Sequence, residues 1–247
     1  MTLYERYLNG ENEKVYEDIY KLGENAFLPN HIAEIEKVLT ETFERVAYNL
    51  DIIYNELVEI NYLFKTDFQY NFDRPLINPL SDTNQLLLKL DEAIKPFGFV
   101  PTSLKMFYKI VGACNFGWDY NTNEDFIWKY ADPIQIISLD DLVSMSTDNY
   151  ALESFQEYYE DDGFISLVIS ADYLHKDNFS GGPPYSLQIT NKPSIDAPFL
   201  NEEHNTSFIK YLRICFENCG FSRITNTKYK NDYKSFFDKV KPQLKRI

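Results

Sequence analysis

The stretch IAEIEKVLTETFERVAYNLDIIYNELVEINYLF, residues 32–64, decides the architecture of this 247-residue chain. Apolar residues recur along it at alternating spacings of three and four, the pattern of one face of a long α-helix: Ile32, Ile35, Leu39, Phe43, Val46, Leu50, Ile53, Leu57, Ile60 and Phe64. A helix of this length extends roughly 50 Å. Pro29 and Asn30 are typical of a helix start. We therefore expect one long helix whose apolar stripe must be covered.

A shorter helix is expected upstream, with apolar residues Leu8, Val15, Ile19 and Leu22. Residues 23–30 would let it fold back on the long helix, so residues 1–70 are predicted to form an N-terminal helical hairpin. The apolar stripe can be covered by packing within the chain or by a second copy in a homodimer. Both alternatives remain open, because a heptad pattern does not specify its partner.

Residues 67–83 are rich in Asn, Asp and Pro and lack a helical period, so we place the join to the main domain there. Two helices should follow. The first ends at Phe97-Gly98, and the second begins at Pro101 and ends at Gly112. Their apolar faces comprise Leu86, Leu87, Leu90 and Ile94 in the first, and Leu104, Phe107, Tyr108 and Val111 in the second.

From residue 126 onward the apolar period changes to two, which is typical of strands. Strands are expected over residues 126–130, 134–138, 164–169 and 185–189. A helix should begin at the capping pair Ser138 and Asp141, and a last helix should end at Gly220. This order predicts an α+β fold over residues 71–222, with a mostly antiparallel sheet packed against helices. Residues 223–247 are predicted to form a basic C-terminal helix or tail.

The net charge of −14 argues against a protein that binds nucleic acid directly, because phosphate binding requires clustered Lys and Arg. Residues 228–247 have a local balance of +5, which leaves −19 for the other 227 residues. A field of this sign attracts basic partners and speeds their encounter. The alternative is that the charge only keeps the protein in solution.

Targeting and redox signals are sparse. Cys114, Cys215 and Cys219 are too few for a disulfide framework, and the start MTLYERYLNGENEK does not have the layout of a signal peptide. No apolar run approaches the roughly 18 residues of a membrane helix. We expect a cytoplasmic protein without membrane contact.

Three groups of segments follow one another in a characteristic order. Residues 97–108 (FGFVPTSLKMFY) and 111–117 (VGACNFG) place an apolar-Pro pair before a helix that ends in an Asn/Gly turn. Asp132-Pro133 then leads to an acidic helix start, and further segments are 169–176, 180–182, 196–198 and 201–206. In this order residues 86–220 resemble the SUKH superfamily, and in particular its long bacterial members.

The resemblance implies a single α+β domain without enzymatic activity. The superfamily includes bacterial immunity proteins, which neutralise a cognate toxin that is often a nuclease or deaminase, and fungal regulators of cell-wall glucan synthesis. Nuclease toxins are generally basic, so an acidic inhibitor agrees with the charge of this chain. The expected partner is a cognate basic toxin, and the alternative is an intracellular scaffold for cell-wall or signalling proteins.

The sequence offers little catalytic machinery. It contains no GxSxG, HExxH or P-loop pattern, so we expect neither an enzyme nor a cofactor. Asp172, His175 and His204 are suitable metal ligands by type, but nothing in the sequence brings His204 near the other two, and ordinary surface or capping roles are favoured. Cys215 and Cys219 are interpreted as small buried apolar residues.

Two acidic stretches are candidate partner-binding surfaces. The first combines aromatic residues with carboxylates: Trp118, Asp119, Tyr120, Glu124 and Asp125. The second comprises Glu157, Glu160, Asp161 and Asp162. The alternatives are a core strand for the aromatic residues around Phe126, Trp128 and Tyr130, and an ordinary solvated helix end for the second stretch.

Overall fold

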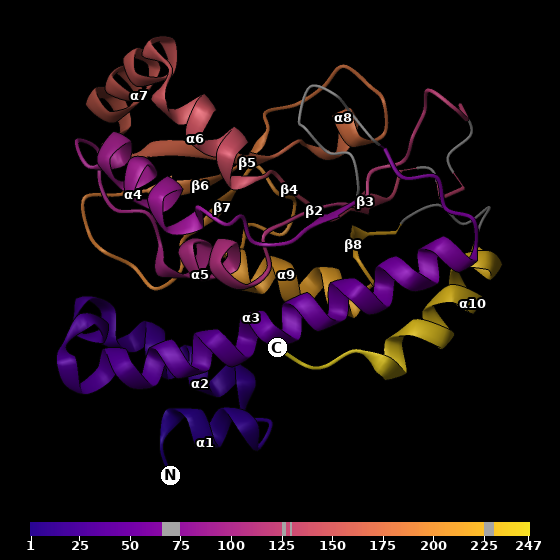
Figure 1. Ribbon diagram of the computed structural model, residues 1–247, viewed down its shortest axis with the longest axis horizontal. Helices are drawn as coiled ribbons and strands as arrows, with labels where there is room; N and C mark the ends of the chain where they lie inside the picture. The colour runs from indigo at the N-terminus through magenta and orange to yellow at the C-terminus, as the bar shows by residue number, and fades with distance from the viewer. Residues whose placement is uncertain (66–74, 125–126, 129, 225–229) are drawn as a thin grey trace.

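A computed structural model describes residues 1–65, 75–124, 127–128, 130–224 and 230–247. The long helix α3 lies below the sheets and forms the base of the molecule on which they rest (Figure 1). This helix runs Pro29–Glu59, with Pro29 in the first turn, where its missing N–H leaves no hydrogen bond unmade. The helix ends five residues before Phe64, because Asn61 adopts a left-handed conformation with φ of 58°. The prediction of a helix through Phe64 was therefore too long at its C-terminal end.

The apolar stripe of α3 is buried by its own chain. Ile35, Val38, Leu39, Phe43, Val46, Ile53 and Leu57 have no exposed surface. Helices α1 (Leu3–Leu8), α5 (Thr102–Ile110) and α10 (Lys230–Val240) contact α3, together with the 3₁₀ turn η1 (Gly23–Phe27). The chain itself therefore covers most of the stripe, as expected for packing within the chain.

The N-terminal hairpin contains one helix more than expected. Helix α1 is started by a capping box in which Thr2 and Glu5 each accept a hydrogen bond from the other's backbone N–H. Gly10, at φ of 90°, turns the chain into α2 (Asn12–Leu22), and η1 then leads back to α3. The predicted fold-back of an N-terminal helical segment on the long helix is confirmed.

Above this base the described residues form three small sheets whose paired strands are all antiparallel, as predicted. The first is β1 (Leu76–Ile77), β2 (Ala113–Asn115) and β4 (Gln135–Ile136); the second is β3 (Asp132–Pro133) and β8 (Phe221–Arg223); the third is β5 (Ile165–Ser170), β6 (Tyr185–Ile189) and β7 (Phe199–Leu200). The flanking helices are α4 (Thr83–Ile94), α6 (Leu139–Thr147), α7 (Asn149–Asp162), α8 (Tyr173–Lys176) and α9 (Phe208–Glu217). A short 3₁₀ turn, η4 (Lys241–Gln243), follows α10. The α+β fold class is thus confirmed.

One predicted strand is wrong. The described residues of the 126–130 segment form turns, and Tyr130 has a left-handed backbone with φ of 65°. Trp128 is nevertheless a core residue, 2% exposed, and its ring packs edge-on against Phe221 at 5.3 Å. The alternating aromatic residues predicted a strand here, but Trp128 is buried from a turn. A period of two in the sequence does not distinguish these two structures.

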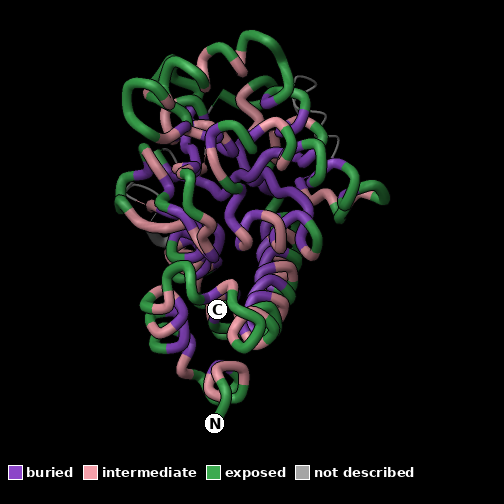
Figure 2. The backbone as a smooth tube through the Cα atoms, turned by 90° about the vertical axis from the view of Figure 1, so that its left-hand side faces the viewer, coloured by how far each residue is buried: buried purple, intermediate pink, exposed green. Residues whose placement is uncertain are grey.

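The buried hydrophobic residues form one cluster that joins the helical base to the sheets. Figure 2 colours the backbone of the buried residues purple, from the long helix into the sheets. Phe43 of α3 packs edge-on against Phe107 of α5, and Phe107 contacts Phe208 of α9. The three cysteines are buried and unpaired, which confirms the apolar role expected for Cys215 and Cys219. In the part of the chain that the structure describes, no helix has the length and apolarity to cross a membrane.

Candidate interaction surfaces

Trp118 does not lie on the surface. It is 1% exposed, its indole Nε1 donates to the carbonyl of Asn123 at 2.9 Å, and its ring packs edge-on against Tyr62 at 5.0 Å. Its expected role as a contact residue is therefore wrong. A tryptophan beside carboxylates in a turn can face inward or outward, and the sequence does not show that Tyr62 lies ready to cover it.

The other polar groups of this loop mostly build the loop itself. Asp119 accepts hydrogen bonds from the N–H of Asn121 at 3.0 Å and from the Thr122 hydroxyl at 3.0 Å. The Tyr120 hydroxyl donates to the Asp177 carboxylate. Burial is the larger cause, and this carboxylate the smaller cause, of a raised pKa of Tyr120. Glu124 is exposed. The remaining predicted residue, Asp125, lies outside the described residues.

Helix α7 lies on the surface of the protein, and none of its 14 residues is buried. Asp148 caps its start by accepting from the N–H of Tyr150 at 2.8 Å, and Gly163, at φ of 73°, ends it. One face rests on the protein: the rings of Phe155 and Tyr159 contact Phe97 at 5.8 and 6.0 Å.

The opposite face of α7 is a single solvent-facing stripe. Successive spacings of three, four and four residues bring the exposed residues onto one side of a helix. We call this set the acidic stripe: Tyr150, Glu153, Glu157 and Asp161, with Glu160 beside them. Tyr150 is 78% exposed. Of the predicted residues, Glu157, Glu160 and Asp161 lie on the stripe, and Asp162 is exposed at the end of the helix.

The carboxylates of the acidic stripe are arranged against helix stability. The helix has no basic residue in its last turn, where the macrodipole favours cations and Glu160, Asp161 and Asp162 stand instead. Glu153, Glu157 and Asp161 are spaced four apart, so like charges are neighbours along the helix. Among the ion pairs formed by described residues, none involves these carboxylates. The local sequence therefore maintains an unneutralised negative surface.

The two predicted stretches do not form one surface. In Figure 1, α7 lies at one upper end of the molecule and the loop that follows β2 lies at the other, beyond β3. A partner of ordinary interface size could cover one of them without touching the other. The acidic stripe is therefore the stronger candidate, since none of its carboxylates forms an ion pair in the described chain and Glu160 only accepts a hydrogen bond from the neighbouring Gln156 side chain.

Asp172, His175 and His204 are not brought together. Asp172 caps α8 by accepting from the N–H groups of Leu174 and His175, and its other oxygen pairs with the His175 ring. Burial alone would raise the pKa of Asp172, but these hydrogen bonds outweigh burial and lower it. His204 lies elsewhere, with Nε2 3.1 Å from the carbonyl of Ser222. Within the described ranges, no group of three or more His, Cys, Asp or Glu side chains is placed to hold a metal ion.

Sequence reasoning missed a buried ion pair. Lys176 Nζ lies 2.8 Å from Asp132 Oδ1, and both side chains are only 2% exposed. The other Asp132 oxygen accepts from the hydroxyls of Tyr185 at 2.9 Å and Ser222 at 2.6 Å. This network joins β3, α8, β6 and β8. The partners of Asp132 in this network lie 44 to 90 residues away from it in the sequence, so no local sequence pattern could predict the network.

No family model matches the chain, and no curated protein or solved structure matches it. Function must therefore be inferred from the molecule's own surfaces. The acidic stripe can attract and hold cations on a large partner.

Proposed function

We propose that this chain is a non-enzymatic protein-binding module that holds a basic protein through the acidic stripe of α7, in the manner of an immunity protein that neutralises a toxin in the cytoplasm. The observation that carries the proposal is an exposed helix with five carboxylates, no basic residue and no internal ion pair in the described chain. The resemblance of residues 86–220 to the SUKH superfamily supports the same class of function.

Electrostatics explain why such a helix suits this task. Clustered charge of one sign raises the rate at which an oppositely charged protein arrives, and salt weakens the effect. Tyr150 and Tyr158, 78% and 57% exposed, add large aromatic surfaces beside the carboxylates. Tyrosines are enriched at the centres of protein interfaces. Basic nuclease-type toxins present the Lys and Arg side chains that this surface would pair with.

The scaffold alternative receives less support. It assigned docking to the long N-terminal helix, and the apolar face of that helix is covered by α1, α5 and α10. Recovery of several partners in a pull-down, none of them a toxin, would favour it over the immunity proposal.

Co-expression with the toxin encoded beside the gene tests the proposal. The variant Glu153→Gln, Glu157→Gln, Asp161→Asn removes three carboxylates from the acidic stripe. A matched control, Glu36→Gln, Glu44→Gln, Asp51→Asn, removes three exposed carboxylates from α3 and changes the net charge by the same amount. Losing three exposed ion pairs with the partner, at about 0.5 kcal/mol each, should weaken binding about tenfold.

We expect the α7 variant to lose protection and the α3 control to keep it. Equal loss in both would mean that only the overall charge matters, and unchanged protection in the α7 variant would remove the acidic stripe from the interface. A thermal melt of both variants distinguishes loss of binding from loss of folding.

A further inference from the structure

The segment 244–247 is held by side chains that contact its main chain. The Asn49 side chain, on α3, both donates to the carbonyl of Lys245 at 2.8 Å and accepts from the N–H of Lys245 at 2.7 Å. A neighbouring β-strand would make the same two-way pairing with its own backbone. Asn49 has no exposed surface, so it is a buried amide whose bonding capacity is directed at this segment.

Two arginines continue the pattern along the segment. Arg45 Nη1 donates to the carbonyl of Arg246 at 2.8 Å, and Arg213 Nε donates to the carbonyl of Ile247 at 2.9 Å. Three consecutive residues are thus bound through main-chain atoms by side chains of α3 and α9. Main-chain recognition of this kind accepts different side chains and is the mode by which proteins bind extended peptides.

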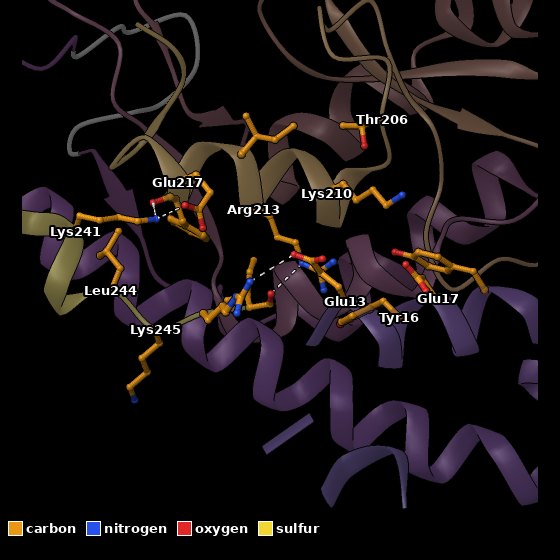
Figure 3. A pocket seen from close by; sticks show the side chains of 15 residues that line it. Glu13, Tyr16, Glu17, Thr206, Lys210, Arg213, Glu217, Lys241, Leu244 and Lys245 are labelled. Atoms are coloured by element: carbon orange, nitrogen blue, oxygen red, sulfur yellow. Dashed lines mark hydrogen bonds and ion pairs between the residues drawn. The ribbon is translucent and has the colours of Figure 1, made fainter. Parts of the chain in front are cut away.

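Selectivity in the segment comes from its first and fourth residues. Ile247 is 3% exposed and belongs to the core, and Leu244 is partly buried against it. Lys245 and Arg246 are exposed, and the Lys245 side chain points away from the cavity in Figure 3. The first and fourth positions are therefore apolar, while the two middle side chains make contacts only at the surface: Lys245 Nζ lies 4.2 Å from the centre of the Tyr48 ring, and Arg246 lies 3.7 Å from Glu13.

The arginine donors are positioned by the fold and not by the segment. Arg45 pairs with Glu41 at 2.7 Å, and its guanidinium stacks on the Tyr7 ring at 4.8 Å. Arg213 stacks on the Tyr16 ring at the same distance. Because these contacts do not involve residues 244–247, both donors stay in place when the segment leaves. Donors positioned in this way bind a peptide without a further ordering cost.

The cleft extends beyond the segment. A cavity of about 650 Å³ lies beside it, lined by Tyr16, Lys210, Arg213, Leu244 and Ile247 among others (Figure 3). A second cavity of about 640 Å³ shares Tyr20, Thr206 and Lys210 with the first and extends from the end of α2 along residues 192–198. Four residues of the chain therefore fill only one end of a longer groove between the N-terminal helices and α9.

We propose that this cleft is a peptide-binding site and that residues 244–247 are the ligand it holds in cis. Its ligand class is an extended peptide with apolar first and fourth residues and solvent-exposed residues between them. A partner's segment with this pattern takes the place of residues 244–247. The proposal goes beyond the proposed function, since it involves no residue of α7.

The test uses the full chain and a fluorescent peptide of residues 241–247, KPQLKRI, amidated at its C-terminus. The variant Ile247→Asp places a carboxylate in the apolar position and so ejects the segment from the cleft. The matched control Arg246→Ala changes the neighbouring side chain, which is 71% exposed, and leaves its main-chain hydrogen bond to Arg45 intact. Binding is followed by fluorescence anisotropy, and folding by circular dichroism.

The Ile247→Asp chain should bind the peptide in a 1:1 complex at least tenfold more tightly than the wild-type or Arg246→Ala chain, whose sites are filled. A peptide with Arg246→Ala should bind within about threefold of the original, and one with Ile247→Asp should not bind. The proposal is overturned if the folded Ile247→Asp chain ignores the peptide, or if the wild-type chain binds it equally well. Unfolding of the Ile247→Asp chain also overturns it, because the segment would then be an integral part of the core.

Discussion

Replacing Lys176 by Met should destabilise the protein far more than the loss of an exposed ion pair. The change leaves the Asp132 carboxylate buried without its cation, and the lysine also lies 4.7 Å from the centre of the Tyr185 ring. Breaking a buried pair from one side costs about 3–5 kcal/mol. For a chain of this size that corresponds to a fall of roughly 10 °C in Tm.

The chain offers a matched comparison for this experiment. Lys105 and Asp91 make an ion pair of nearly the same length, 2.7 Å, but their side chains are 29% and 38% exposed. Lys105→Met should cost less than about 1 kcal/mol, since solvent screens the pair. Burial is the physical difference that separates the two lysines.

A double-mutant cycle measured by urea unfolding completes the test. Asp132→Asn keeps an acceptor for Tyr185 and Ser222 while removing the charge, and the double variant removes both charges. We expect the double variant to be less destabilised than the sum of the single changes by about 2 kcal/mol or more. Additive effects, or equal losses in Lys176→Met and Lys105→Met, would refute the reasoning.

Three further predictions concern pH, backbone and helix charge. Asp172→Asn should lower the free energy of unfolding at pH 7, and this loss should shrink as pH falls below 3.8, because a lowered pKa contributes stability only while the carboxylate is ionised in the folded state. Urea melts from pH 7 to 3 measure the loss, and a loss that stays constant over this range contradicts the prediction. Gly112→Ala should be severely destabilising, since its Cβ would lie 2.1 Å from the carbonyl oxygen of Ile77. The control Gly10→Ala places its Cβ in open space and costs only the strain of a positive φ, about 1–2 kcal/mol. Similar Tm losses in the two variants would argue against the close approach of β1. Glu160→Gln with Asp161→Asn should raise Tm by about 1–3 °C by relieving the unfavourable helix end, and a fall in Tm would show that these carboxylates have a structural role.

Periodic segments were the part of the fold that the sequence predicted well. The alternation of three and four in residues 32–57 specified the buried face of α3, and Ser138 caps α6 by accepting from the N–H of Asp141. The strand expected at 164–169 lies one residue further along, at Ile165–Ser170. These features depend on neighbours within a few positions, so local sequence contains them.

Features that depend on distant partners were missed. Trp118 is buried because Tyr62 lies beside it, and the turn around Trp128 is packed against Phe221. Asn49 binds Lys245 across 196 residues of sequence. In the candidate surfaces, helical spacing predicts that Glu157 and Asp161 share a face, but the exposure of that face could be known only after Phe155 and Tyr159 were seen to rest on Phe97.

The central claim is that a basic protein binds on the acidic stripe of α7. Amide hydrogen exchange of the full chain, with and without a basic nuclease-type toxin as the proposed partner, tests it most directly. We predict slowed exchange in residues 149–162 that fades as salt is raised, with the loop at 118–124 unchanged. Protection confined to that loop or to any other surface, with α7 exchanging as in the free protein, would contradict the account.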